Sequence, residues 1–140
     1  MKPKASRLLL SLSQNRDEGL REMYSPQIAE HIANPRNVGE LESPSGIGDV
    51  TNEVCFDRIR LTVRIEDERL TDARVKASGC PPTIAAASVL TELIIGRSLR
   101  ELDSLTRKDI AGALGHLPPA KAHCTALAID ALRAAVGFKR

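Results

Sequence analysis

The sequence predicts an α+β domain in which a small antiparallel β-sheet packs against several helices. Two observations predict this class. Two adjacent runs near the middle of the chain alternate apolar and polar residues with the period of a β-strand, and the segments on both sides carry helix caps and helical spacing of apolar residues. The 140 residues suit one domain with its own core, and 42% hydrophobic with 27% charged residues is typical of a globular protein.

The first helix is expected to begin just after Ser25. Ser25 is a suitable N-cap, Pro26 suits the first helical position, and Pro35 ends the helix. Residues 1–23 are expected to form an N-terminal tail that is flexible or partly helical, so the domain is expected over residues 24–140.

A loop and then a β-hairpin are expected next. Residues 38–52 are rich in Gly, Pro and Ser, which predicts a loop. Positions 59, 61, 63 and 65 are apolar and alternate with polar residues, and positions 73, 75 and 77 repeat the pattern after "EDER". Apolar residues that face each other must share one side of the sheet, so the numbers of each pair should sum to 134 or 136. Ala73 then lies opposite Leu61 or Val63, respectively.

The rest of the chain is predicted to be helical. One helix follows Cys80 and ends before Gly96, and Ser98 and Thr106 are suitable N-caps for two short helices. The last helix is expected over residues 121–136. A stripe at helical spacing on it should face the core, and it consists of Cys124, Leu127, Ala128, Ala131 and Ala135.

Composition excludes several classes of function. Basic and acidic residues number 20 and 18, and aromatic residues make up 2% of the chain, so neither a basic patch nor a base-stacking surface for nucleic acid is expected. No stretch approaches the length of a membrane span, and "RLLLSLSQ" lacks the features of a signal peptide. A cytoplasmic protein is therefore expected, in which three reduced cysteines favour metal binding or catalysis over disulfides.

The cysteines occupy related positions in the predicted structure. Cys55 and Asp57 are expected on one face of a strand, close to Cys80 at the strand-to-helix corner. Cys124 lies in or near the first turn of the last helix, and a helix N-terminus favours the thiolate form. Spacing alone leaves a metal site and simple core packing both open, because no C-x-x-C motif is present and free cysteines often fill cores. Taken alone, an aspartate at position 57 is more often a solvated strand residue, and a histidine at position 123 is more often a helix-capping or core histidine.

Five segments of the chain resemble the IscU/NifU-type scaffold proteins for iron–sulfur cluster assembly. They are "YSPQIAEHIANPRNVG", "CFD", "DARVKASGC", "AAASVLTELIIGRSL" and "LPPAKAHCTALAIDALRAA", and the resemblance covers residues 24–137. It implies that the three cysteines, Cys55, Cys80 and Cys124, are cluster ligands and that Asp57 or His123 supplies the fourth position. It further implies that Cys124 accepts persulfide sulfur beside Lys121 and His123, and that a third strand lies within residues 46–54.

The resemblance also implies a cargo and partners. The chain would assemble a cluster, 2Fe–2S by expectation, and transfer it to apo-proteins as a scaffold rather than as an enzyme. A cysteine desulfurase would supply sulfur, and a DnaK-type chaperone would recognise Leu117–Lys121. The sequence departs from the family at Phe56, at Pro81–Pro82 and at Ala120. Two alternatives stay open: a zinc protein that uses the same ligands, and a cluster-free modulator of a desulfurase.

Overall fold

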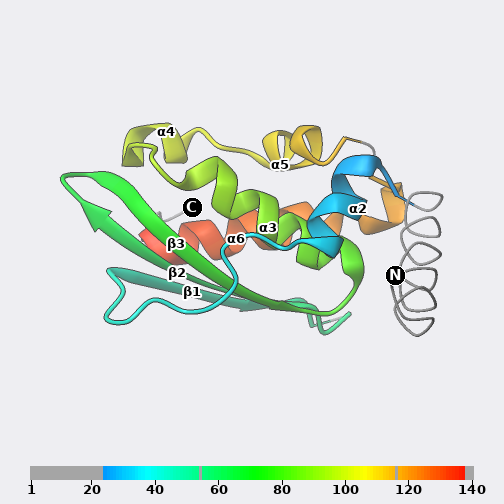
Figure 1. Cartoon of the computed structure of the whole chain (residues 1–140), viewed down its shortest axis with the longest axis horizontal. Coiled ribbons are helices and arrows are strands. Elements are labelled where there is room, and N and C mark those ends of the chain that lie inside the picture. The colour runs from blue at the N-terminus through cyan, green and yellow to red at the C-terminus, as the bar shows by residue number, and fades with distance from the viewer. Residues whose placement is uncertain (1–23, 54, 116, 138–140) are drawn as a thin grey trace, which may run out of the picture.

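A three-stranded antiparallel sheet forms one layer of the molecule, and helices cover one of its faces (Figure 1). This computed structural model describes residues 24–53, 55–115 and 117–137, so the predicted tail at residues 1–23 lies outside the described residues. The strands follow chain order in the sheet: β1 (Gly46–Thr51), β2 (Arg58–Glu66) and β3 (Arg69–Ser78). The predicted α+β class is confirmed.

Two long helices lie directly on the sheet, and the shorter helices pack around them (Figure 1). The long helices are α3 (Pro81–Ile94) and α6 (His123–Val136). The shorter ones are α2 (Pro26–Ala33), α4 (Leu99–Asp103), α5 (Arg107–Ala113) and the 3₁₀ turn η1 (Pro119–Lys121). None of the helices in the described residues combines the length and the apolar character that a membrane crossing requires.

The hairpin of β2 and β3 has one of the two predicted registers. Val63 lies opposite Ala73, and the pairing continues in this register to Arg58 and Ser78 at the open end. Near the turn a bulge shifts the pairing by one residue, which alternation alone did not predict. Asp67 and Glu68 both have positive φ, as a two-residue hairpin turn of type I′ requires.

Composition predicts a loop over residues 38–52, and this prediction is wrong for residues 46–51, which form strand β1. The third strand that the family resemblance implies is confirmed. Its glycines are there because α6 packs directly against the strand backbone. A Cβ added at Gly46 would lie 1.8 Å from the carbonyl oxygen of Ala135, and one added at Gly48 would lie 2.0 Å from that of Ala131. Glycine ordinarily weakens a strand, but here it permits a close approach that a side chain would prevent.

The predicted caps and the predicted inward face of the last helix are confirmed. The Ser25 hydroxyl accepts a hydrogen bond from the backbone N–H of Ile28 at the start of α2. Capping boxes at Ser98 and Thr106 begin α4 and α5. Every residue of the predicted stripe on α6 is buried in the core between the sheet and α3.

The other face of the sheet is polar and carries ion pairs. Asp49 on β1 accepts hydrogen bonds from Arg58 and Arg60 on β2, and Arg60 also pairs with Glu40 in the preceding loop. The buried Thr62 hydroxyl accepts a hydrogen bond from the backbone N–H of Leu41. This face therefore ties β1, β2 and the loop before β1 together.

Candidate metal centre

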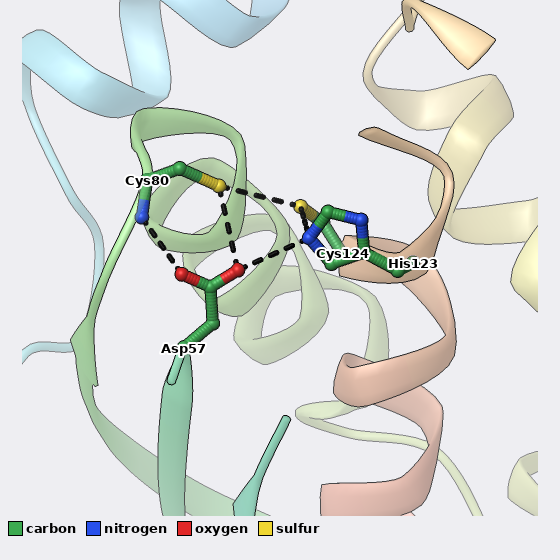
Figure 2. Close-up of side chains that lie close together, drawn as sticks. All are labelled: Asp57, Cys80, His123 and Cys124. Carbon is green, nitrogen blue, oxygen red and sulfur yellow. Dashed lines mark hydrogen bonds and ion pairs between the residues drawn. The ribbon is translucent and has the colours of Figure 1, made fainter. Parts of the chain in front are cut away.

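Four side chains that could hold a metal ion meet where the N-terminal ends of α3 and α6 approach the start of β2 (Figure 2). They are Asp57, Cys80, His123 and Cys124, and one ligand atom from each lies within 4.8 Å of the others. Chain segments that are far apart in the sequence supply them. Figure 1 shows both long helices starting at the same end of the sheet, which is why these segments can share one site.

Asp57 lies at the centre of this group and is 2% exposed. Its Oδ1 accepts a hydrogen bond from the backbone N–H of Cys80 at 3.0 Å, and its Oδ2 lies 3.1 Å from Nε2 of His123. Burial by itself would raise the pKa of Asp57. Hydrogen bonds from the Cys80 backbone, His123, Thr83 and the Cys80 thiol outweigh burial and hold that pKa below its ordinary value. The site therefore contains a carboxylate at neutral pH.

Gly79 makes the approach of Asp57 to Cys80 possible. Its φ is +122°, a conformation that residues with a side chain rarely adopt, and a Cβ there would lie 1.9 Å from Oδ1 of Asp57. Sequence reasoning assigned Gly79 no role. The signal that points to it is a glycine directly before a cysteine at a strand-to-helix corner.

The two cysteines of the group bring their sulfurs close together. Cys80 is the N-cap of α3 without a side-chain capping bond, and Cys124 lies in the first turn of α6 with no exposed surface. Their Sγ atoms are 3.7 Å apart, which is close to the separation expected for two thiolates on one metal ion, roughly 4 Å. The Thr83 hydroxyl lies 3.2 Å from each sulfur.

Burial controls the protonation of Cys124. It raises the pKa of the Cys124 thiol to about 12; the hydrogen bond from Thr83 opposes this rise, while Cys80 and Asp57 add to it. The prediction that the helix start lowers this pKa is therefore wrong for the metal-free protein. The thiol is neutral at pH 7, and binding of a cation would release its proton.

Cys55 lies outside the four-residue group. It occupies the exposed turn between β1 and β2, where its backbone N–H donates to Oδ1 of Asn52. Strand β2 begins only at Arg58, and Phe56 has a φ of +59°. Cys55 is exposed and Asp57 is buried, so the prediction that they share one strand face is wrong. A ligand role for Cys55 stays a prediction.

Lys121 ends the 3₁₀ turn just before α6. It is half-buried, and no side chain in the described residues forms a hydrogen bond or an ion pair with its ammonium group. Two residues of the segment Leu117–Lys121, Pro119 and Ala120, are exposed. The role of Lys121 beside Cys124 and the chaperone contact at this segment stay predictions. Of the other histidines, His31 is buried against Ser88, and residue 116 is not among those described.

An α+β domain with thiol, imidazole and carboxylate groups gathered at one end of its sheet has the fold and the donor atoms of a candidate metal-binding protein, and comparison identifies the family of the chain. The chain belongs to the family described as the NifU-like N terminal domain, whose model matches residues 23–139. The resemblance that the sequence indicates is confirmed.

Individual relatives are similar over most of their length. The chain is 42% identical over 114 residues to the iron-sulfur cluster assembly scaffold protein IscU 1 of Archaeoglobus fulgidus, covering 81% of this chain and 74% of that protein. It is 41% identical over 117 residues to the scaffold protein IscU of Escherichia coli K12, covering 81% and 91%. A crystal structure of a NifU-like N-terminal protein from Brucella abortus has the same fold, with a TM-score of 0.69, 19% identity and coverage of 81% and 91%.

Proposed function

We infer that this chain is a scaffold on which an iron–sulfur cluster is assembled and from which the cluster passes to apo-proteins. Its family and the names of its relatives support this function. The observation that carries it is the convergence of Cys80, Cys124, Asp57 and His123 on one site, with the two sulfurs 3.7 Å apart. The cluster, 2Fe–2S in our proposal, is cargo.

The mixture of ligands suits a cargo that must leave. Thiolates are the usual ligands of iron–sulfur clusters, so Cys80 and Cys124 supply the strong attachment. Asp57 and His123 offer harder oxygen and nitrogen donors, which bind such a cluster less firmly than a further thiolate would. An incoming thiolate of an acceptor protein can displace these weaker ligands first.

Cys55 is proposed as the third thiolate. It precedes Asp57 by two residues, and two residues of chain span at most about 7 Å. Rearrangement of the exposed turn is therefore enough to bring its sulfur to the group. The same turn carries Phe56, whose side chain is 77% exposed beside the site.

Sulfur delivery is proposed to occur at Cys124. Its thiolate would attack the outer sulfur of a persulfide on a cysteine desulfurase, forming a persulfide on Cys124 and releasing the donor's thiolate. Cys124 has no exposed surface, so this step requires the site to open, and Lys121 would then stabilise the thiolate. The protein is the acceptor in this step and not a turnover enzyme.

The segment Leu117–Lys121 is proposed as the contact for a DnaK-type chaperone.

One observation favours a second candidate, a zinc-binding protein of the same fold. Without Cys55, the group still offers two thiolates, one imidazole and one carboxylate, which is a complete tetrahedral set for Zn²⁺. Zinc in this site would block cluster assembly or stabilise the fold.

Anaerobic reconstitution with iron and sulfide tests the two candidates. The scaffold predicts a visible sulfur-to-iron absorption band and equal amounts of iron and acid-labile sulfide that remain after desalting. Replacement of Cys80 or Cys124 by Ala should abolish both. If the desalted protein contains one zinc per chain and no sulfide, this result would contradict the scaffold function and support the zinc-binding function.

A further inference from the structure

Thr83 is a buried residue that sequence reasoning did not assign to the site. It lies on the first turn of α3, three residues after Cys80, and none of its surface is exposed. Its Oγ1 is 3.2 Å from Sγ of Cys80 and 3.2 Å from Sγ of Cys124. The hydroxyl therefore lies between the two sulfurs that the proposed function assigns to the cargo.

Two other buried threonines show what a helical threonine in this protein ordinarily does. The hydroxyl of Thr91 on α3 donates to the carbonyl oxygen of Ser88 at 2.7 Å, and that of Thr125 on α6 donates to the carbonyl oxygen of Ala122 at 2.8 Å. Both bond three residues back along the chain, a common arrangement for threonine. The Thr83 hydroxyl instead contacts both sulfurs.

The chemistry of this contact changes when a metal binds. In the metal-free protein the hydroxyl can accept a hydrogen bond from the S–H of one thiol and donate a hydrogen bond to the other sulfur. Metal-bound thiolates have lost their protons and only accept, so the hydroxyl then becomes a donor to sulfur. A hydrogen bond to a thiolate withdraws negative charge from it and weakens its donation to the metal.

We propose that Thr83 is a positioning residue of the cargo site, which donates a hydrogen bond to the metal-bound thiolate of Cys80 or Cys124 and so eases release of the metal. This inference rests on the proposed function, because it assigns both sulfurs to the cargo. In this inference the Thr83 hydroxyl, which does not itself bind the cargo, weakens the bond between the cargo and the thiolate that does.

Three variants separate the hydroxyl from its packing. Thr83→Val keeps the branched shape and removes the hydroxyl, whereas Thr83→Ser keeps the hydroxyl and removes a methyl group. Thr91→Val is the matched control, because it removes a buried hydroxyl from the same helix where that hydroxyl bonds a carbonyl oxygen and Asn37 rather than a sulfur. Should Thr83→Val fail to fold, Thr83→Ala compared with Thr83→Ser makes the same distinction.

The probe is Co²⁺ added to the metal-free, reduced full-length protein. Loss of the donor should move the sulfur-to-cobalt charge-transfer band of Thr83→Val to longer wavelength. Transfer of Co²⁺ to a chelator should slow by about fivefold, the factor that a hydrogen bond of ordinary net strength contributes. Thr83→Ser and Thr91→Val should resemble the wild type in both measurements.

Several results would overturn the inference. They are an identical band and release rate in wild type, Thr83→Val and Thr83→Ser, a serine variant that follows valine, or a wild type without a sulfur-to-cobalt band. The proposed function fails separately, when iron and sulfide form no transferable cluster. A shift in the cobalt band that is specific to Thr83→Val would support the role of the hydroxyl even then.

Discussion

At the scale of the residue, the candidate metal centre depends on hydrogen bonds to the buried carboxylate of Asp57. Asp57 stays ionised although it is buried, because the backbone N–H of Cys80 and the ring of His123 lie against its two oxygens. The resemblance to a family could identify these residues, since each lies beside a motif cysteine. Gly79 and Thr83 could not be identified in this way, because their roles arise from contacts that only the folded chain creates.

Substitution of Gly79 should damage both the fold and the site. In Gly79→Ala the new Cβ meets the Asp57 carboxylate, and the positive φ adds a strain of about 1–3 kcal/mol. We expect a lower free energy of unfolding in urea and loss of Zn²⁺ binding in a titration. Gly96→Ala is the control, because Gly96 also has a positive φ, of +91°, but no atom lies within 4 Å of the added Cβ. It should lose stability and keep its zinc; equal zinc binding in both variants would disprove the role of Gly79.

Metal binding should release protons at neutral pH. The Cys124 thiol has a pKa of about 12 without metal, so it must lose its proton when it becomes a ligand. The apparent affinity for Zn²⁺ should therefore rise with pH, by about tenfold per pH unit for each proton released. Calorimetry in buffers of different ionisation enthalpy counts these protons. Release of fewer than one proton per zinc at pH 7 would show that Cys124 is not a ligand.

At the scale of the element, alternation and caps predict most of the structure because they report which face of each segment is buried. The register of β2 and β3 follows from the apolar positions, and the starts of α2, α4 and α5 follow from local side-chain caps. Strand β1 could not be predicted from local pattern, because its glycines are required by the close packing of the α6 backbone, which is far away in the sequence. The position of Cys55 was also not predicted correctly: alternation extends β2 back to Cys55, whereas the strand begins at Arg58 and Cys55 lies in the turn before it.

The ion pairs between β1 and β2 should make stability depend on pH in acid. Hydrogen bonds from Arg58 and then Arg60 lower the pKa of Asp49 to about 2. The folded pKa is below the unfolded value of about 4, so this stability is complete above pH 4 and is lost as the pH falls toward 2. Asp49→Asn should lower the free energy of unfolding by about 0.5–1 kcal/mol at pH 7.

Urea denaturation at several pH values measures this effect. The difference between wild type and Asp49→Asn should shrink as the pH falls from 4 to 2 and disappear only below pH 2, where Asp49 becomes protonated in the folded state as well. Asp130→Asn alters an exposed residue of α6 and should follow the wild type throughout. A difference between wild type and Asp49→Asn that is constant with pH would mean that the substitution acts through packing rather than charge.

At the scale of the whole molecule, the sheet and the two long helices meet at one end (Figure 1), and there they bring the four candidate metal-binding side chains together. Asp57 precedes β2, Cys80 begins α3, and His123 and Cys124 begin α6. A ligand that binds only this arrangement must stabilise the whole fold. Binding of a metal at this site would therefore be coupled to folding of the domain.

Zinc should raise the melting temperature of the protein. Free Zn²⁺ at 100 times its dissociation constant adds about 2.7 kcal/mol to the free energy of unfolding, and a chelator should remove this gain. Cys124→Ala should show no increase relative to its own metal-free form, whereas Cys55→Ser should keep the increase, because Cys55 is outside the four-residue group. Loss of the increase in Cys55→Ser would place that cysteine among the zinc ligands.

The central claim is that the site holds a cluster in order to release it, and cluster transfer from wild type and Asp57→Ala to an apo-ferredoxin tests this claim most directly. Asp57 also holds the backbone of Cys80, so the variant should be less stable whichever metal the site carries, and the rate of transfer is the decisive quantity. We predict that both proteins acquire a cluster, that the wild type delivers it, and that Asp57→Ala delivers it more slowly because the ligand that an incoming thiolate displaces has been altered. A wild type that keeps its cluster in the presence of apo-ferredoxin, or equal transfer from both proteins, would contradict the account.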